Sequence, residues 1–167
     1  MPKAIQNKIK QLLCEATVHY HRLVLLVGET GSGKTTVLRA LGEDLGVEVI
    51  NVNLTLSAKL IELTERQRAL HISTLLGEIL EKTGEVALLD NTEMLFDRKV
   101  KQDPVRLLQS LSRKCRVVAS WNGRIVGGKL TYAETCHSEC RTYDRDEFQI
   151  VVMNETFLHC PEERRRI

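Results

Sequence analysis

A glycine-rich loop between an apolar run and a helical pattern is the feature that most restricts the fold of this chain. The run Leu23–Val27 has five apolar residues in succession, which is typical of a strand buried on both faces of a parallel sheet. After the loop, Thr35–Leu45 has helical spacing and ends before Gly46, a common residue just past a helix end. Val47–Val52 then predicts a second strand. The pattern indicates a β-loop-α-β unit.

The same alternation continues along the chain. Apolar residues three and four apart predict one or two helices in Leu54–Thr83, and a first helix in Ile5–Ala16. The remaining predicted elements are strands at Val86–Asp90, Arg116–Ser120 and Phe148–Met153, a helix at Pro104–Arg113, and a hairpin at Arg124–Tyr132 that turns at Gly127 and Gly128. This order predicts an α/β fold with a mainly parallel central sheet, in which ligands bind at the C-terminal ends of the strands.

Length and charge exclude several classes of protein. The 167 residues fit a single domain, residues 1–167, with an N-terminal helix in 1–20, a core in 21–153 and a short tail in 154–167. The 24 basic and 22 acidic residues leave a net charge of +2, which does not predict a nucleic-acid-binding surface. No apolar run approaches the ~20 residues that span a bilayer, and the first residues do not form a signal peptide. We expect a cytoplasmic protein without a membrane partner.

The loop itself matches the P-loop pattern G-x4-G-K-[ST] in full, in the strand-loop-helix context that the motif requires. Glycines let its backbone N–H groups approach phosphates closely. Lys34 is expected to reach the β and γ phosphates, and the Thr35 hydroxyl suits Mg²⁺. The sequence predicts a P-loop NTPase, a three-layer α/β/α sandwich that binds ATP and Mg²⁺ through Gly28, Glu29, Thr30, Gly31, Ser32, Gly33, Lys34, Thr35 and Thr36.

Asp90 ends the third apolar run and has the form of a Walker B aspartate, so it is the second predicted Mg²⁺ residue beside Thr35. P-loop ATPases with an additional central strand usually have glutamate directly after this aspartate, but here the residue is Asn91. An amide can orient a water molecule but cannot take its proton. Glu93 is the natural substitute as catalytic base, and a solvated turn glutamate is the alternative.

Polar residues also follow the fourth predicted strand. Ser120 and Asn122 stand where related ATPases place a residue that hydrogen-bonds the γ phosphate or the attacking water, and Asn122 is the predicted catalytic residue of the two. Trp121 between them is expected to pack at the strand end against the core. No arginine can be assigned as an intersubunit finger from the sequence, although four lie in the half where such a finger would occur: Arg113, Arg116, Arg124 and Arg141. Surface solvation is the expected state of most of them.

The five cysteines do not predict a disulfide framework, because their number is odd and no export signal precedes them. Cys136, Cys140 and the pair His159–Cys160 could in principle surround zinc, but a Cys-x3-Cys without a second spaced pair is a weak signature. Free thiols are the simpler interpretation.

Four segments together resemble the BrxF family, the small P-loop proteins of bacterial type 3 BREX phage-defence systems: Leu23–Thr36, Leu88–Phe96, Val117–Gly123 and Leu130–Glu134. Glu62–Arg68 is also similar to that family, and the resemblance runs from about Ile9 to Val152. The family's Pro-Gly-His-Pro-Glu-Tyr-like stretch is replaced here by Thr135–Cys140, where only His137 and Glu139 match. The family's role for that stretch is therefore not carried over to this chain.

The resemblance implies an AAA-like core without a helical lid domain. It also implies a cytoplasmic protein that works beside a methyltransferase, a larger ATPase, a phosphatase-like protein and a helicase that together restrict phage DNA. Because only a short tail follows the last predicted strand, we expect the chain to need a partner, or further copies of itself in a homo-oligomer, to complete a site.

Four functions remain open from the sequence. The leading hypothesis is an ATPase subunit that uses ATP·Mg²⁺ to assemble or regulate a phage-defence complex. The second is a nucleotide-binding switch that barely hydrolyses ATP, as Asn91 suggests. A small-molecule kinase ranks last, because no arginine-rich lid is evident. Direct DNA contact is the fourth, because two groups of basic residues could meet phosphates: Arg98, Lys99 and Lys101, and the terminal Arg164–Arg166. Three terminal arginines are more simply a solvated tail, and any DNA contact is expected to be indirect.

Overall fold

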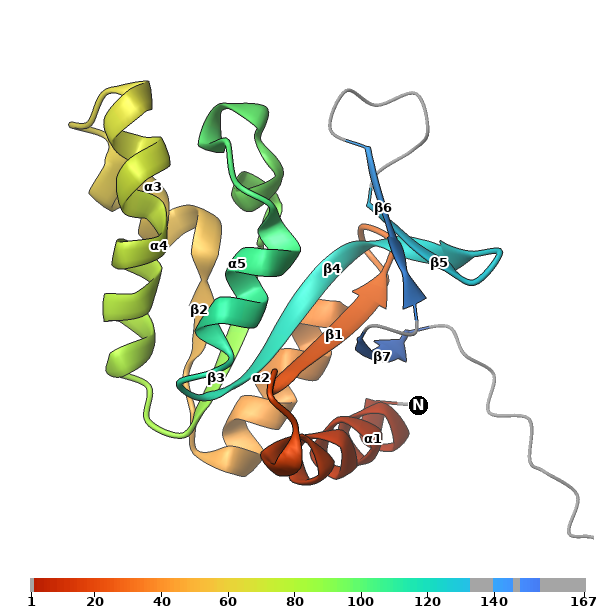
Figure 1. The fold of residues 1–167 in the computed structure, drawn as a ribbon. Coiled ribbons are helices and arrows are strands. Elements are labelled where there is room, and N and C mark those ends of the chain that lie inside the picture. The colour runs from red at the N-terminus through yellow and green to blue at the C-terminus, as the bar shows by residue number, and fades with distance from the viewer. Residues whose placement is uncertain (1, 133–139, 146–147, 154–167) are drawn as a thin grey trace, which may run out of the picture.

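A parallel sheet forms the centre of the molecule (Figure 1). The computed structural model describes residues 2–132, 140–145 and 148–153. The sheet runs in the order β2-β3-β4-β1-β7, and each of these neighbours pairs in parallel. The strands are β1 (Leu23–Gly28), β2 (Val49–Asn51), β3 (Val86–Asp90), β4 (Arg116–Val126) and β7 (Gln149–Val152). The predicted α/β fold is confirmed, with β4 inserted between β1 and β3.

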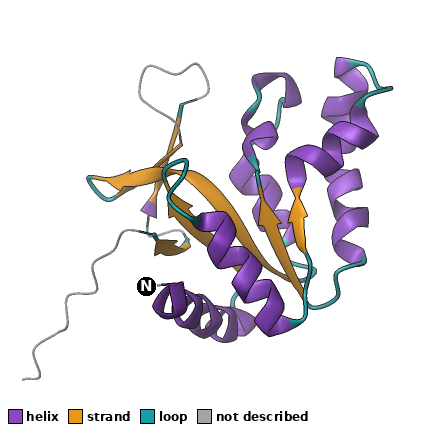
Figure 2. Cartoon of the chain, turned by 180° about the vertical axis from the view of Figure 1, so that it is seen from behind, coloured by secondary structure: helices purple, strands orange, loops and turns teal. Residues whose placement is uncertain are grey.

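Helices cover both faces of this sheet (Figure 2). The two hydrophobic clusters separate by strand alternation: Val24 and Leu26 of β1 pack with one set of helices, and Leu25 and Val27 pack with the other. The first set is α1 (Pro2–Glu15) and α2 (Lys34–Leu45), and the second is α3 (Val52–Leu60), α4 (Glu65–Glu81) and α5 (Pro104–Leu111). The result is the predicted three-layer sandwich.

Short helical turns connect these elements. They are the 3-10 helices η1 (Ala16–Val18), η2 (Glu93–Phe96) and η3 (Arg98–Val100). The predicted helical stretch Leu54–Thr83 is divided in two because Thr64 and Gln67 form a capping box that starts α4. Asp103 caps α5 and Pro104 occupies its first turn. Within the described part of the chain, no helix combines the length and the apolar character needed to cross a bilayer.

The second strand is shorter than predicted. The expected strand Val47–Val52 is confined to Val49–Asn51, and α3 starts at Val52. The side chain of Asn51 accepts a hydrogen bond from the backbone N–H of Leu54, 3.0 Å away, and so caps the helix. The capping ability of Asn51 therefore outweighs the apolar alternation that predicted a longer strand.

The fourth strand is longer than predicted. Instead of ending at Ser120, β4 continues to Val126 and pairs antiparallel with β5 (Lys129–Tyr132), which pairs with β6 (Arg141–Asp144). The predicted turn at Gly127 and Gly128 is confirmed, and both residues have positive φ angles, 56° and 74°. The hairpin therefore begins inside the sheet strand itself and projects from its end (Figure 1).

An aromatic cluster fixes the base of this hairpin. Phe96 stacks on Tyr132 with ring centroids 3.5 Å apart, and Trp121 meets Phe96 edge-on at 4.9 Å. Trp121 is fully buried, and its indole N–H donates to the carbonyl of Thr131 at 2.9 Å. The prediction that Trp121 packs against the core at the strand end is confirmed. The cluster joins η2 to the hairpin.

Two leucines of α4 allow a matched test of the core. Leu76 is fully buried under the sheet, whereas Leu70 on the same helix is 66% exposed. We expect Leu76→Ala to lower the free energy of unfolding by about 2 to 5 kcal/mol, because it removes packed methyl groups and leaves a cavity. Leu70→Ala is expected to change it by less than about 0.5 kcal/mol. Equal effects in denaturant unfolding would contradict the assignment of the buried face of α4.

Candidate functional site

The glycine-rich loop lies at the C-terminal end of β1 and leads into α2. Gly31 and Gly33 have positive φ angles, 79° and 94°, in the left-handed region that favours glycine. At Gly28 the constraint is space: an added Cβ would overlap Ser32 Oγ and lie 2.9 Å from Met153 Cγ. The sequence therefore folds into a tight loop that leads directly into the N-terminus of α2.

Lys34 is folded back into this loop. Its Nζ donates to the carbonyl oxygens of Gly28 at 2.8 Å and Glu29 at 2.7 Å, and to Ser32 Oγ at 3.4 Å. The side chain is buried, and burial lowers the pKa of Lys34. The nearby carboxylates of Asp90 and Glu93 oppose that shift. The ammonium group could therefore donate to phosphate oxygens in place of the loop carbonyls.

Thr35 and Asp90 come together from two elements. The Thr35 hydroxyl, in the first turn of α2, donates to Asp90 Oδ2 at 2.6 Å, and Asp90 is buried at the end of β3. A hydroxyl and a carboxylate at the mouth of a phosphate-binding loop are hard oxygen donors, which Mg²⁺ prefers. The donor set fits the predicted metal, and Thr35 and Asp90 are the residues that would hold it.

Glu93 is held by two amides. Asn53 Nδ2 donates to Glu93 Oε2 at 2.9 Å, and Asn122 Nδ2 donates to the other oxygen, Oε1. Asn53 also accepts from the backbone N–H of Met94 at 2.8 Å, so it binds both the side chain and the backbone of η2. The structure therefore brings Glu93 and Asn122 together from η2 and β4.

Asn53 was missed by the sequence reasoning. The expected strand Val47–Val52 ended beside it, and no role was given to the polar residue that follows. The available signal was its place after a strand of a parallel sheet, where side chains from different strands meet. Asn53 stands one residue into α3, next to the end of β2.

Asn91 shapes the turn that presents Glu93. Its φ is 50°, a left-handed conformation that asparagine adopts more readily than most residues. Its carbonyl accepts from the backbone N–H of Asn53 at 3.0 Å. Thr92 then anchors the turn with a buried hydrogen bond to the Ser120 carbonyl at 2.9 Å. Ser120 is itself buried, and its carbonyl oxygen anchors this turn.

Residues of the glycine-rich loop, α2, β3, η2 and β4 line one cavity of about 340 Å³. Its walls contain one ammonium group and two carboxylates, so the carboxylate charge is only partly balanced by Lys34. A divalent cation would correct that balance. The lining residues are Thr30, Gly31, Gly33, Lys34, Thr35, Asp90, Asn91, Glu93 and Asn122. Gly28, Glu29 and Ser32 contribute the loop behind this lining, and Thr36 is exposed on α2.

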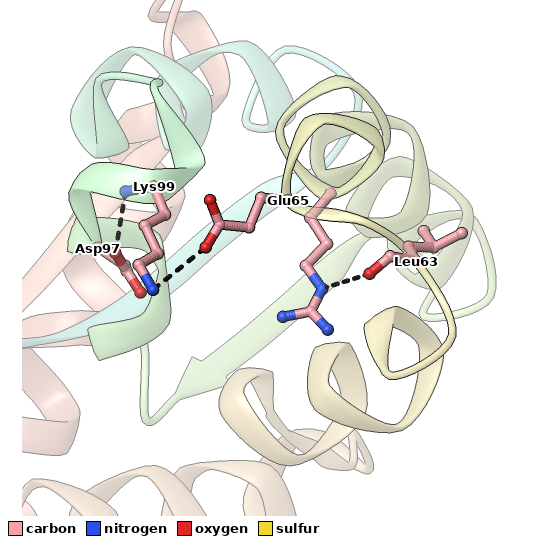
Figure 3. A network of polar contacts seen from close by, with 5 residues as sticks. Leu63, Glu65, Asp97 and Lys99 are labelled. Atoms are coloured by element: carbon pink, nitrogen blue, oxygen red, sulfur yellow. Dashed lines mark hydrogen bonds and ion pairs between the residues drawn. The ribbon is translucent and has the colours of Figure 1, made fainter.

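A second cavity lies beside η2. It has about 280 Å³, is mainly apolar, and is lined by residues of α3, α4, η2 and η3 that include Leu60, Met94 and Val100. Figure 3 shows the polar contacts around it: Lys99 Nζ lies 3.2 Å from Glu65 Oε1, and the Lys99 N–H donates to Asp97 Oδ1 at 2.9 Å. Lys99, one of the basic residues considered for DNA contact, is therefore paired with an acid.

The four arginines considered as fingers all have different surroundings. Arg113 stacks over the ring of Tyr20, 4.7 Å from its centroid, and Arg116 lies 3.6 Å from Glu85. Arg124 forms an ion pair with Glu29 of the phosphate loop at 3.0 Å. Arg141 opens β6 on the projecting hairpin. Only Arg124, among these four, contacts a residue of the predicted site.

The weak zinc hypothesis falls mostly outside the described residues, which do not include Cys136, His159 or Cys160. Within the described ranges there is no cluster of three His, Cys, Asp or Glu side chains that could hold a metal. Cys14, Cys115 and Cys140 are free thiols. Burial raises the pKa of Cys115, which favours the unreactive thiol form.

The lowered pKa of Lys34 predicts a pH dependence of stability. Between the folded pKa and the unfolded value of 10.5, the unfolded state binds more protons than the folded state, so the free energy of unfolding rises with pH. We expect Lys34→Met to remove this contribution. Urea unfolding of both proteins from neutral pH to pH 10.5 should therefore show a difference that grows in favour of the wild type. Parallel curves would contradict the lowered pKa.

Comparison with known proteins agrees with this geometry. The chain is 30% identical over 104 residues to the replication factor C large subunit of Nanoarchaeum equitans (strain Kin4-M). That match covers 56% of this chain and 22% of the relative, so the chain spans about a fifth of the relative's length. Residues 4–141 match the family model described as AAA ATPase domain. The match includes the loop, β3, η2 and β4 with all their site residues, and the chain belongs to the AAA ATPase domain family.

Proposed function

We propose that this chain binds ATP as its magnesium complex and hydrolyses it in the cavity between the glycine-rich loop and Glu93. The observation that carries the proposal is the 2.6 Å contact between Thr35 Oγ1 and Asp90 Oδ2 beside the buried ammonium of Lys34. Hard oxygens and a cation are thus presented together at a helix N-terminus, the arrangement suited to a metal-bound triphosphate.

Binding would exchange contacts within the loop for contacts to phosphate. Lys34 would give up the carbonyls of Gly28 and Glu29 and donate to the β and γ phosphates. The loop N–H groups and the N-terminus of α2 would add partial positive charge. Magnesium, held by Thr35 and Asp90, would offset the charge of the phosphate oxygens.

Hydrolysis would need Glu93 as the base. The oxygen of a water molecule would attack the γ phosphorus, its proton would pass to the Glu93 carboxylate, and the bond to the β-γ bridging oxygen would break to release ADP. In the described arrangement each Glu93 oxygen accepts one amide hydrogen bond. A carboxylate oxygen has further lone-pair sites, and the loss of one amide partner would open more of the carboxylate to the attacking water.

Asn122 is the partner suited to leave. Asn122 is the last residue of β4 that pairs with β1, and it lies opposite Gly28 of the loop. A γ phosphate in the cavity would therefore offer the Asn122 amide a new acceptor. Turning toward that phosphate would free Glu93 Oε1 for water. Asn91 would serve as the turn residue that aims Glu93, with an amide that can orient the water but not deprotonate it.

A second candidate is a nucleotide-binding switch that does not hydrolyse ATP. The observation that favours it is the occupation of both Glu93 oxygens by Asn53 and Asn122. If ATP binding leaves these hydrogen bonds in place, Glu93 stays bound to both amides and is less open to an attacking water. The bound nucleotide would then act through the shape of the loop and η2 alone.

The biological setting of the proposal rests on the resemblance to the BrxF family. The chain would act in the cytoplasm with other phage-defence proteins, and its nucleotide state would assemble or regulate their complex. Copies of the chain in a homo-oligomer would complete the site. Contact with DNA would be made through these partners, which agrees with the pairing of Lys99 to Glu65.

The crowding at Gly28 gives a test of nucleotide binding. We expect Gly28→Ala to weaken ATP binding roughly tenfold or more, because the new methyl group displaces Ser32 and deforms the loop around Lys34. Gly46→Ala is the matched control: it lies at the far end of α2 with a φ of 66° and open space. It should cost about 1 kcal/mol of stability and leave ATP affinity intact. Calorimetric titration measures both affinities.

Turnover separates the ATPase from the switch. We expect wild-type protein to hydrolyse ATP with Mg²⁺, alone or with partner proteins, and Glu93→Gln to bind ATP while losing about a hundredfold or more in rate. Asp97→Asn removes a nearby carboxylate outside the cavity, keeps an N-cap for η3, and should leave the rate unchanged. Lys34→Ala should lose binding.

Two results would overturn the ATPase assignment. Tight ATP binding without turnover in any condition would replace it by the switch. Full turnover in Glu93→Gln would show that another group is the base. Circular dichroism of each variant is the control for folding.

A further inference from the structure

An ion pair connects the projecting hairpin to the phosphate-binding loop. Arg124 Nη2 lies 3.0 Å from Glu29 Oε1, and both side chains are more than half exposed. Glu29 is the second residue of the glycine-rich loop, and Arg124 lies on β4 just beyond the part that pairs with β1. An exposed pair of this kind contributes little stability by itself. Its position beside the loop is the informative feature.

The position of Arg124 is fixed by the backbone around it. Arg124 pairs with Thr131 of β5, and the Thr131 hydroxyl donates to the Arg124 carbonyl at 3.0 Å. Gly123 has no room for a Cβ, which would overlap the Thr131 carbonyl and lie 2.9 Å from the indole nitrogen of Trp121. The buried Trp121 thus holds the two strands close together. The backbone of Arg124 is thus held by strand pairing, while its side chain is more than half exposed.

Arg124 shares a strand face with Asn122. Successive side chains of a strand point to opposite faces, so residues two apart lie on the same face, about 7 Å apart. Asn122 lines the nucleotide cavity and donates to Glu93. Arg124 is therefore the next side chain along that face, and its guanidinium reaches the loop at Glu29.

The charge of the cavity favours a second cation when a triphosphate is bound. Among the residues that line it, Lys34 is the only basic one, beside the carboxylates of Asp90 and Glu93. A guanidinium binds phosphate through two parallel hydrogen bonds and is always protonated, so phosphate oxygens are stronger partners for Arg124 than one exposed carboxylate.

We propose that Arg124 is a phosphate-binding residue of its own chain. In the free protein its guanidinium is held by Glu29. When ATP binds, it moves from Glu29 to the oxygens of the terminal phosphate. Glu29 is thus a resting partner that competes with the nucleotide, and the ion pair makes the site respond to the third phosphate. This proposal rests on the proposed ATP site.

The test compares a triphosphate with a diphosphate. Affinities for a non-hydrolysable ATP analogue and for ADP, each with Mg²⁺, are measured by calorimetric titration. We expect Arg124→Ala to weaken the triphosphate roughly tenfold or more while ADP changes by less than about twofold, because only the triphosphate offers the terminal oxygens. Arg116→Ala is the matched control. It removes another arginine of β4 that pairs with a glutamate, Glu85, at the opposite end of the strand, and should change neither affinity.

Variants of Glu29 test the competition. Glu29→Gln should strengthen triphosphate binding several-fold with little effect on ADP, and the gain should vanish in the double variant Glu29→Gln, Arg124→Ala. Arg124→Lys keeps the charge without the planar fork and should recover part of the lost affinity. If Arg124 only braced the loop, Arg124→Ala would weaken the triphosphate and ADP equally.

The outcomes separate the two proposals. If wild type binds both nucleotides, Lys34→Ala binds neither, and Arg124→Ala loses them equally or not at all, the role of Arg124 is wrong and the ATP site stands. If wild type binds no nucleotide, both proposals fail. Thermal unfolding of each variant shows whether the fold is kept.

Discussion

The parallel pairing of β1 with β4 is the interaction on which the site depends. Its register sets Gly28, where the phosphate loop begins, beside Asn122. Because β3 pairs with the other edge of β4, Asp90 comes to the same end of the sheet. The buried alternation of Val24, Leu25 and Leu26 holds this register against both helical layers. Polar groups that are distant in the sequence therefore meet at this end of the sheet, where they form hydrogen bonds such as the one between Thr35 and Asp90.

Much of the fold could be predicted from the sequence because unbroken apolar runs and glycines mark buried strands and their loops clearly. Asp90 ends such a run, and its position close to Thr35 follows from the parallel arrangement of the strands. The ends of β2 and β4 were harder to predict. Asn51 ends β2 early by capping α3, and β4 continues through Gly123 because Trp121 and Thr131 close the hairpin over it. Both depend on side-chain hydrogen bonds that periodicity does not contain.

The contacts of Glu93 illustrate the same limit. Its nearness to the cavity depends on the left-handed turn at Asn91, and its two partners come from α3 and β4. Asn53 is invisible to a motif search, since its role arises only when α3 begins beside η2. Glu93 nevertheless brings a carboxylate to the cavity two residues after Asn91, and Asn53 and Asn122 both donate hydrogen bonds to it.

The aromatic cluster gives the molecule a built-in optical reporter. Trp121 is the single tryptophan of the chain, and it is sealed between Phe96 at the end of η2 and Tyr132 of the hairpin. Glu93 begins the same short helix, so any rotation of η2 that frees the carboxylate also moves the ring that touches the indole. Under the proposed mechanism, native fluorescence would therefore report the release of Glu93 from its amide partner, without a label on the nucleotide or on the protein.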